Sequence, residues 1–210
     1  MKVNKKVLMP FMIVILPALG NLEALTDVRL WFLLAICVAA SFLQPNYNLS
    51  SKKANTKDHG TEIQIIWAVA ITQLTAVIEF CYFKQVPSSW NIIDVFAVTA
   101  MISGFALRTW AVHTLGQFFT MHITVQDQQK IIQTGPYKIF RHPSYVGAFL
   151  LYLGTITFLH SWYSLIAASF LLPTVWIRRI YFEEKMLLES FGDEYKTYCK
   201  KAKRLIPWVW

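Results

Sequence analysis

The sequence is poor in charged residues and in cysteine, and each shortage excludes a class of protein. Charged side chains make up 15% of its 210 residues, against roughly 25% in an ordinary soluble domain. The three cysteines are an odd number, and Cys37 and Cys81 lie inside apolar blocks, which fits neither a disulfide framework nor a zinc site. The 55% of hydrophobic residues gather in long blocks, which predicts a membrane protein with several spans.

Several catalytic motifs are also missing. The eight glycines are all isolated, so there is no GxGxxG and no Walker loop, which argues against a Rossmann-type nucleotide site. There is no HExxH, GxSxG or CxxC either, which removes several common hydrolase and redox classes. Glu79, Asp94 and Arg108 lie near the predicted ends of apolar blocks, where snorkelling would explain them. This disfavours an ion pathway.

The order of the apolar blocks predicts the architecture. They cover residues 7–19, 30–43, 63–83, 92–112, 145–160 and 162–177. The first two are short for a span of roughly 20 residues and predict a helical hairpin, as do the last two, which are almost contiguous. Charged and apolar residues alternate over 178–201, as in a helix on the membrane surface. We therefore predict an all-α bundle of five to six membrane-embedded helices and a C-terminal amphipathic cytoplasmic helix.

Positive charge predicts the orientation of this bundle. The net charge is +8, and lysines occur at the N-terminus, in 44–60, in 113–144 and after residue 178. All these segments lie on one side if the six blocks cross in turn, so both termini are predicted to be cytoplasmic, in a prokaryotic plasma membrane or the endoplasmic reticulum. No basic stripe is interleaved with aromatics in a polar domain, so no nucleic-acid partner is predicted. We expect the chain to divide into N-terminal membrane helices (1–112) and a C-terminal region that holds the candidate catalytic residues (113–210).

Polar chemistry gathers first in the stretch GPYKIFRHPSYVG, residues 135–147. Pro143 suits the first turn of a helix, and the N-terminus of such a helix favours an anion such as a carboxylate. Arg141 adds a planar donor fork that suits a carboxylate or phosphate. Tyrosine, arginine and histidine are also common anchors at the head-group boundary, so a binding site and an interfacial anchor are both open here.

A second cluster follows the last apolar block, where Arg178 and Arg179 precede Glu183 and Glu184. A solvated helix start would explain it. However, adjacent helical side chains point about 100° apart, so the two carboxylates do not share one direction. The predicted hairpin also returns this cluster to the face that holds His142. Convergence of the two clusters predicts one polar site.

The run TGPYKIFRHPSYVG, followed by EEKMLLESFGDEYKTYCKKAKRLIP, resembles the isoprenylcysteine carboxyl methyltransferase family. That family is similar in turn to the membrane phospholipid N-methyltransferases. The resemblance covers about residues 116–207. It implies a membrane methyltransferase that uses S-adenosylmethionine, releases S-adenosylhomocysteine and needs no metal. Its implied acceptor is lipid-like, first of all the carboxylate of a prenylated cysteine, with a phospholipid amine as the alternative. A small transporter or membrane scaffold is the alternative outside enzymes, although the two halves share no repeat.

The resemblance also implies roles for individual residues. Contacts to the cofactor are implied for His122, Gln129, Lys130, Ile131, Ile132, Tyr137, His142, Pro143, Ser144, Tyr145, Glu183 and Glu184. Among these, the two isoleucines would line the adenine side, and the glutamates would bind the polar end. The catalytic, acceptor-facing arginine would be Arg179, with Arg178 as a near alternative and Arg141 beside them.

Overall fold

The computed structural model describes residues 5–43, 59–83, 89–120, 123 and 128–205 of the chain. Its α-helices are α1 (Lys5–Ala18), α2 (Val28–Leu43), α3 (Thr61–Tyr82), α4 (Ile92–Leu115), α5 (Pro143–Phe158), α6 (Trp162–Phe191) and α7 (Asp193–Lys201). Short 3-10 helices are η1 (Leu22–Thr26), η3 (Gly116–Phe118) and η4 (Gly135–Lys138). The part of the chain that the structure describes contains no strand longer than a single bridge. The predicted all-α class is confirmed.

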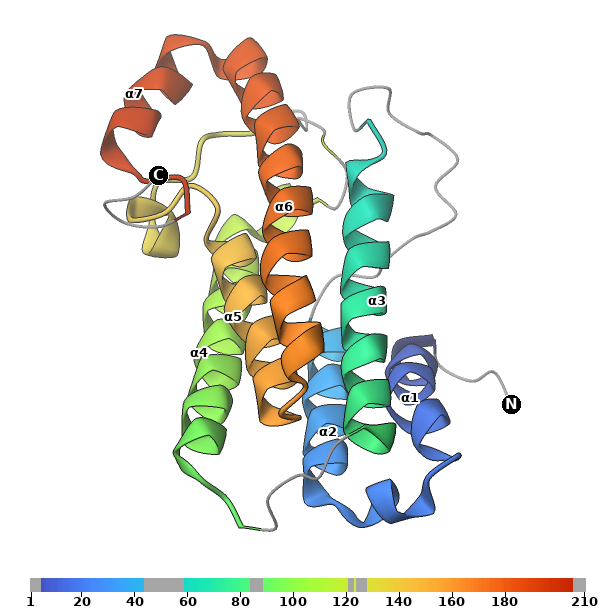
Figure 1. Ribbon diagram of the computed structural model, residues 1–210. Coiled ribbons are helices and arrows are strands. Elements are labelled where there is room, and N and C mark those ends of the chain that lie inside the picture. Colours follow the sequence, from blue (N-terminus) through green and yellow to red (C-terminus); the bar gives the residue numbers. More distant parts are fainter. Residues whose placement is uncertain (1–4, 44–58, 84–88, 121–122, 124–127, 206–210) are drawn as a thin grey trace.

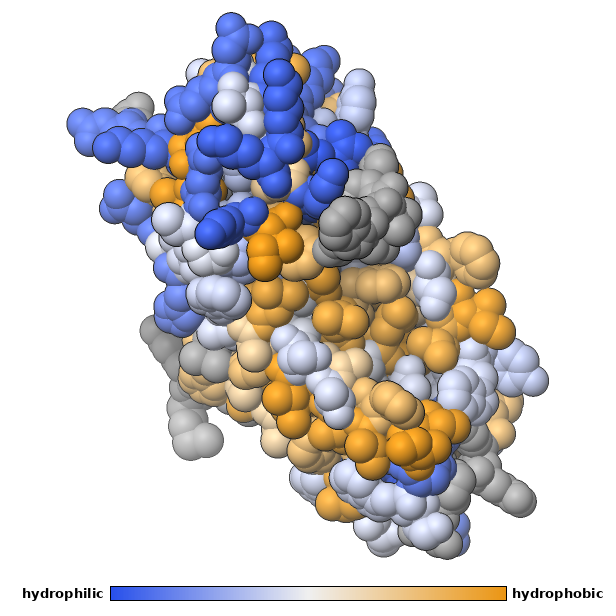
Figure 2. Space-filling view, turned by 90° about the vertical axis from the view of Figure 1, so that its left-hand side faces the viewer, coloured by the Kyte–Doolittle hydropathy of each residue, from blue (hydrophilic) through white to orange (hydrophobic). Residues whose placement is uncertain are grey.

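The dimensions of the bundle suit a membrane. Three helical segments, Thr61–Tyr82, Ile92–Phe118 and Trp162–Phe191, are long and apolar enough to cross one. The shorter apolar helices Leu8–Ala18, Val28–Phe42 and Pro143–Phe158 complete the bundle. Figure 2 shows hydrophilic residues gathered at the upper end of the molecule and a broad hydrophobic band below them. The upper end carries α7 and the C-terminal turns of α6 (Figure 1).

Helix α6 differs from the sequence prediction. We expected the apolar helix to end at residue 177 and a separate surface helix to follow. Instead α6 continues to Phe191 through Pro173, because no glycine or further proline interrupts the charged stretch before Gly192. Gly192 has φ 53°, which suits glycine, and the short α7 then folds back beside α6 (Figure 1). The charged turns after residue 177 therefore stand on a rigid extension of a membrane helix.

Helices α4 and α5 pack with their backbones in close approach. A Cβ atom added to Gly147 would lie 2.6 Å from the backbone nitrogen of Arg108 and 2.7 Å from the carbonyl oxygen of Gly104. Gly147 is the last residue of the RHPxYxG stretch, so this glycine allows the start of α5 to sit against α4. The side chain of Arg108 reinforces the contact, because its Nη1 donates to the carbonyl oxygen of Ser144 at 3.1 Å. This packing fixes the position of His142, the residue before α5.

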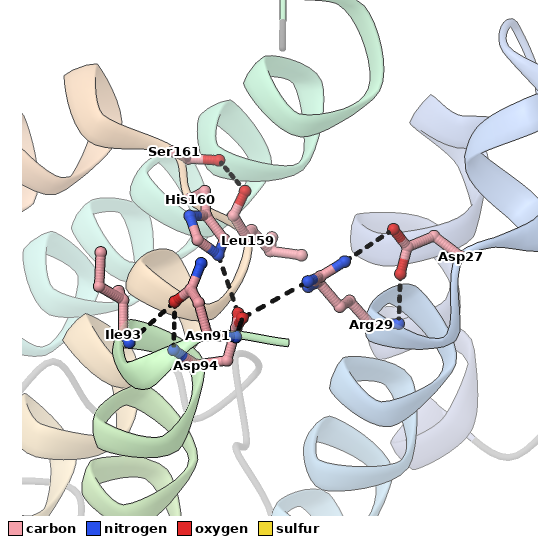
Figure 3. Close-up of polar contacts among 8 residues, drawn as sticks. All are labelled: Asp27, Arg29, Asn91, Ile93, Asp94, Leu159, His160 and Ser161. Atoms are coloured by element: carbon pink, nitrogen blue, oxygen red, sulfur yellow. Dashed lines mark hydrogen bonds and ion pairs between the residues drawn. The ribbon is translucent and has the colours of Figure 1, made fainter. Parts of the chain in front are cut away.

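The expectation that Glu79, Asp94 and Arg108 snorkel to the interface is wrong, because all three are buried inside the bundle. Asp94 is fully buried; its carboxylate lies 2.8 Å from His160 Nε2 and 3.5 Å from Arg29 Nη2. Figure 3 shows these groups converging from α4, the α5–α6 turn and the start of α2. Paired charges here tie together helix ends at the opposite end of the bundle from α7.

Candidate active site

Three stretches that are far apart in the sequence meet at the carboxylate of Glu184. Its oxygens lie 3.0 Å from Arg141 Nε, 3.2 Å from His142 Nε2 and 2.6 Å from Arg204 Nη2. Arg141 and His142 come from the start of α5, Glu184 from the extension of α6, and Arg204 from the segment after α7. The prediction that the glutamate pair lies close to His142 is confirmed. The Glu184 carboxylate therefore connects the segment before α5, the extension of α6 and the segment after α7.

The segment after α7 is held against the loop before α5. Lys203 forms an isolated parallel bridge with Phe140, in which the backbone nitrogen of Arg141 donates to the Lys203 oxygen at 2.7 Å and the Lys203 nitrogen donates to Ile139 at 2.9 Å. In addition, the hydroxyl of Tyr198 donates to the carbonyl oxygen of Tyr137 at 2.8 Å. As a result α7 becomes one wall of a cavity.

This cavity holds about 750 Å³ of space not occupied by protein atoms, a volume that includes open solvent at its mouth. Its walls come from the end of α4, the segment before α5, the extension of α6 and α7. Predicted site residues that line it are Gln129, Lys130, Ile131, Ile132, Tyr137, Arg141, His142, Arg179 and Glu183.

Five predicted residues lie outside this lining: Arg178, Pro143, Ser144, Tyr145 and Glu184. Pro143 does begin α5, as its position in the sequence predicts. The hydroxyl of Tyr145 donates to Glu183 Oε2 at 2.9 Å, so Tyr145 orients a residue of the lining. Arg178 is directed toward α3, where it contacts the side chain of Gln64 and the backbone of His59. The predicted contact His122 lies outside the described residues.

Sequence reasoning assigned no role to about half of the lining. The unassigned residues are Leu115, Phe118, Thr120, Ile123, Met186, Leu187, Phe191, Tyr195 and Tyr198. Most are apolar, and apolar side chains carry little sequence signal for a ligand. Helical spacing could have found Met186 and Leu187, because they follow Glu183 by three and four residues and so share its face of α6.

Charges of both signs face the cavity. Lys130, Arg141 and Arg179 bring positive charge, and Glu183 brings negative charge. Arg179 is only 4% exposed, and its Nη1 donates to the hydroxyl of Thr61 at 3.0 Å. This contact across to α3 holds its guanidinium in place. Among the described residues, no group of three histidine, cysteine or acidic side chains is placed to hold a metal ion.

The tyrosines of the cavity are neutral hydrogen-bond donors. Burial raises the pKa of the phenols of Tyr137, Tyr195 and Tyr198 above the ordinary value of 10.0, because burial penalises the charged form. At physiological pH each therefore keeps its proton. The cavity thus combines charged groups, neutral donors and an apolar wall.

Comparison with known proteins identifies the family of this chain. The model of the Isoprenylcysteine carboxyl methyltransferase (ICMT) family matches residues 96–189. A probable protein-S-isoprenylcysteine O-methyltransferase of Oryza sativa subsp. indica is 32% identical over 148 residues, which are 70% of this chain and 77% of that protein. This chain belongs to the isoprenylcysteine carboxyl methyltransferase family. It is therefore a methyltransferase, as the resemblance implies.

Further relatives agree with this family. Protein-S-isoprenylcysteine O-methyltransferase B of Arabidopsis thaliana is 32% identical over 144 residues, which are 68% of this chain and 73% of the relative. The solved structure of the eukaryotic intramembrane Ras methyltransferase ICMT matches with a TM-score of 0.57 at 21% identity, over 97% of this chain and 73% of that one. This likeness shows the same helical membrane fold.

Proposed function

We propose that this protein transfers a methyl group from S-adenosylmethionine to the carboxylate of a prenylated cysteine, releasing S-adenosylhomocysteine. The curated relatives carry that acceptor in their names, as protein-S-isoprenylcysteine O-methyltransferases. The observation that supports this function most directly is the cavity, which sets Arg141, His142 and Glu183 beside an apolar wall at the α7 end of the bundle.

The residues of the cavity fit such a cofactor. Its amino-acid end carries an ammonium and a carboxylate, and the cavity offers Glu183 for the first and Arg141 with His142 for the second. The apolar wall, which includes Ile131 and Ile132, suits a flat, uncharged base. When bound, S-adenosylmethionine supplies an electrophilic methyl group on a sulfonium.

The proposed reaction requires the residues of the site to position the acceptor and the cofactor, and it requires no proton transfer. A carboxylate acceptor is already ionised at neutral pH, so no general base is required. The protein must hold the acceptor in line and keep water out. We assign the acceptor carboxylate to Arg179, because it is buried and held by Thr61, and its fork suits a bidentate contact. Arg178 is the weaker alternative, since it is exposed and bound to Gln64.

The cofactor part of this function is tested by calorimetric titration of the purified protein with S-adenosylhomocysteine. We expect saturable binding to the wild type and a loss of roughly tenfold or more for His142→Ala, because a lost charged contact costs about 1.5–3 kcal/mol. Lys185→Ala is the matched control, since Lys185 is exposed on the same helical extension and lies outside the lining. A folded wild type that binds nothing would overturn the proposal.

The acceptor part is tested by comparing Arg179→Lys with Arg178→Lys. With N-acetyl-S-farnesyl-L-cysteine as acceptor, Arg179→Lys should raise the acceptor KM about tenfold or more, because lysine has no bidentate fork. Its KM for S-adenosylmethionine should change little. Arg178→Lys, at the next position of the same helix, should leave both constants near those of the wild type. Equal effects of the two substitutions would contradict the role of Arg179.

We also propose that the α7 end of the molecule faces the cytoplasm and that the prenyl chain enters laterally from the bilayer. The lysine distribution of the sequence supports this orientation, as does the hydrophilic upper surface (Figure 2). Lys196 is an exposed position on α7, so a Lys196→Cys variant tests the orientation. A membrane-impermeant maleimide should label it, above the wild-type background, only in vesicles whose cytoplasmic face is outside.

A further inference from the structure

Tyr195 is a buried tyrosine whose hydroxyl has no hydrogen-bond partner in the part of the chain that the structure describes. The residue is 3% exposed and lines the cavity from α7. Its Oη atom is buried, and no hydrogen bond reaches it from the described residues. A buried polar group without a partner destabilises a fold, so native structures keep few of them, often for a function. Tyr195 follows the last residue that the family model matches, residue 189.

Tyr198, one turn further along α7, provides the contrast. It is 4% exposed and also lines the cavity. Its hydroxyl, however, donates to the carbonyl oxygen of Tyr137 at 2.8 Å. The two rings lie 6.0 Å apart between centroids. Two tyrosines of one helix therefore face one cavity. Of these two hydroxyls, that of Tyr198 forms a hydrogen bond to a described residue and that of Tyr195 does not.

The surroundings of Tyr195 indicate what kind of ligand atom its hydroxyl would meet. Ile131, Leu187 and Phe191 pack against the cluster that Tyr195 forms with Tyr198, and all three line the cavity. Burial raises the pKa of the Tyr195 phenol, so it remains a donor. Glu184, Arg141 and Glu183 also act on this phenol electrostatically, but the side chains packed against its ring are apolar, and a neutral donor among them suits an uncharged ring system with acceptor atoms. It suits an ammonium poorly, since both groups are donors.

We propose that Tyr195 donates a hydrogen bond to the nucleoside part of the cofactor, so that α7 contributes to recognition of the adenosyl group. This inference rests on the proposed function. It assigns the two ends of the ligand to different elements: the amino-acid end to the start of α5 and to Glu183, and the nucleoside to the wall that α7 completes. Gly192 and the Arg204–Glu184 ion pair then serve to hold this wall in place.

The test compares S-adenosylhomocysteine with 5′-methylthioadenosine, which has the nucleoside but lacks the amino acid. Binding of both is measured by calorimetry for the wild type, Tyr195→Phe, Tyr198→Phe and Glu183→Gln. Tyr195→Phe should lose roughly tenfold, about 1.4 kcal/mol, for both ligands by the same factor, because an acceptor of the ligand is left unpaired. Glu183→Gln should weaken S-adenosylhomocysteine and leave 5′-methylthioadenosine unchanged.

Thermal unfolding without ligand supplies the control for folding. Tyr195→Phe should melt at or above the wild-type temperature, because it removes an unpaired hydroxyl. Tyr198→Phe should melt lower, because it leaves a buried carbonyl unpaired. Tyr195→Phe binding of 5′-methylthioadenosine with wild-type affinity would overturn the inference, as would losses for the two ligands that differ more than about threefold. A wild type that binds neither ligand would instead overturn the proposed function.

Discussion

Glu183 and Glu184 are adjacent in the sequence, but the structure predicts different consequences when each is changed to glutamine. Glu184 lies outside the cavity and pairs with Arg141, His142 and Arg204. Glu183 lines the cavity and accepts a hydrogen bond from the hydroxyl of Tyr145. We expect Glu184→Gln to weaken mainly the fold and Glu183→Gln to weaken mainly cofactor binding.

The magnitudes follow from burial and pairing. The Glu184 side chain is 11% exposed, and breaking a buried pair by removing one partner costs about 3–5 kcal/mol. Because the Arg204 side chain is 29% exposed and keeps some water, we expect about 2–3 kcal/mol. The Glu183 side chain is 30% exposed, so the hydrogen bond that it accepts from Tyr145 is worth about 1 kcal/mol. At about 2–4 °C per kcal/mol for a chain of this size, Glu184→Gln should melt roughly 5–10 °C lower.

Tryptophan fluorescence during heating measures the first effect, and calorimetry with S-adenosylhomocysteine measures the second. A Glu184→Gln/Arg204→Gln double variant is the internal control. It should regain part of the lost stability, because the guanidinium left without its carboxylate is also removed. If Glu183→Gln melts lower than Glu184→Gln, or if Glu184→Gln melts like the wild type, the pairing around Glu184 is not what holds the three stretches together.

Three further predictions concern the rest of the fold. Gly147→Ala should destabilise the protein by about 1–3 kcal/mol through overpacking, since its methyl would meet the backbone of α4; an unchanged melting temperature would contradict the close approach of α4 and α5. Asp94→Asn should cost about 2–3 kcal/mol, because it weakens a fully buried pair with Arg29, which keeps Asp27 as a partner; affinity for S-adenosylhomocysteine should stay unchanged, and a large loss would show that the two ends are coupled. The stability that the buried phenols of Tyr137, Tyr195 and Tyr198 contribute should be complete below pH 10 and fall above it, because their pKa values are raised in the fold and these phenols ionise first in the unfolded chain. The tyrosinate absorbance of these three residues should then appear together with unfolding, after that of the exposed tyrosines.

Local sequence signals predicted part of the fold and site. Pro143 marks the start of α5 because proline suits the first turn of a helix, and the structure begins the helix there. The close spacing of the last two apolar blocks predicted the hairpin that returns Glu184 to His142. Both inferences depend on short-range geometry, which a sequence encodes directly.

Other features depend on partners that are distant in the chain. Asp94 looked like a residue near a helix end, and only its burial against His160 and Arg29 shows a paired interior charge. The unbroken course of α6 past residue 177 was not predicted, because the change from apolar to charged residues marks where the environment changes and not where the helix ends. Tyr195 has a recognisable place in the sequence pattern, yet its unpaired hydroxyl appears only once α7 is folded against the cavity.

The most direct test of the central claim is transfer of a tritiated methyl group from S-adenosylmethionine by the purified protein in lipid nanodiscs. N-acetyl-S-farnesyl-L-cysteine and phosphatidylethanolamine would be offered as competing acceptors. We predict that label enters the farnesylcysteine and is released by mild alkali, as a methyl ester requires. Alkali-stable label in the phospholipid, with none in the farnesylcysteine, would show an amine methyltransferase and contradict the account.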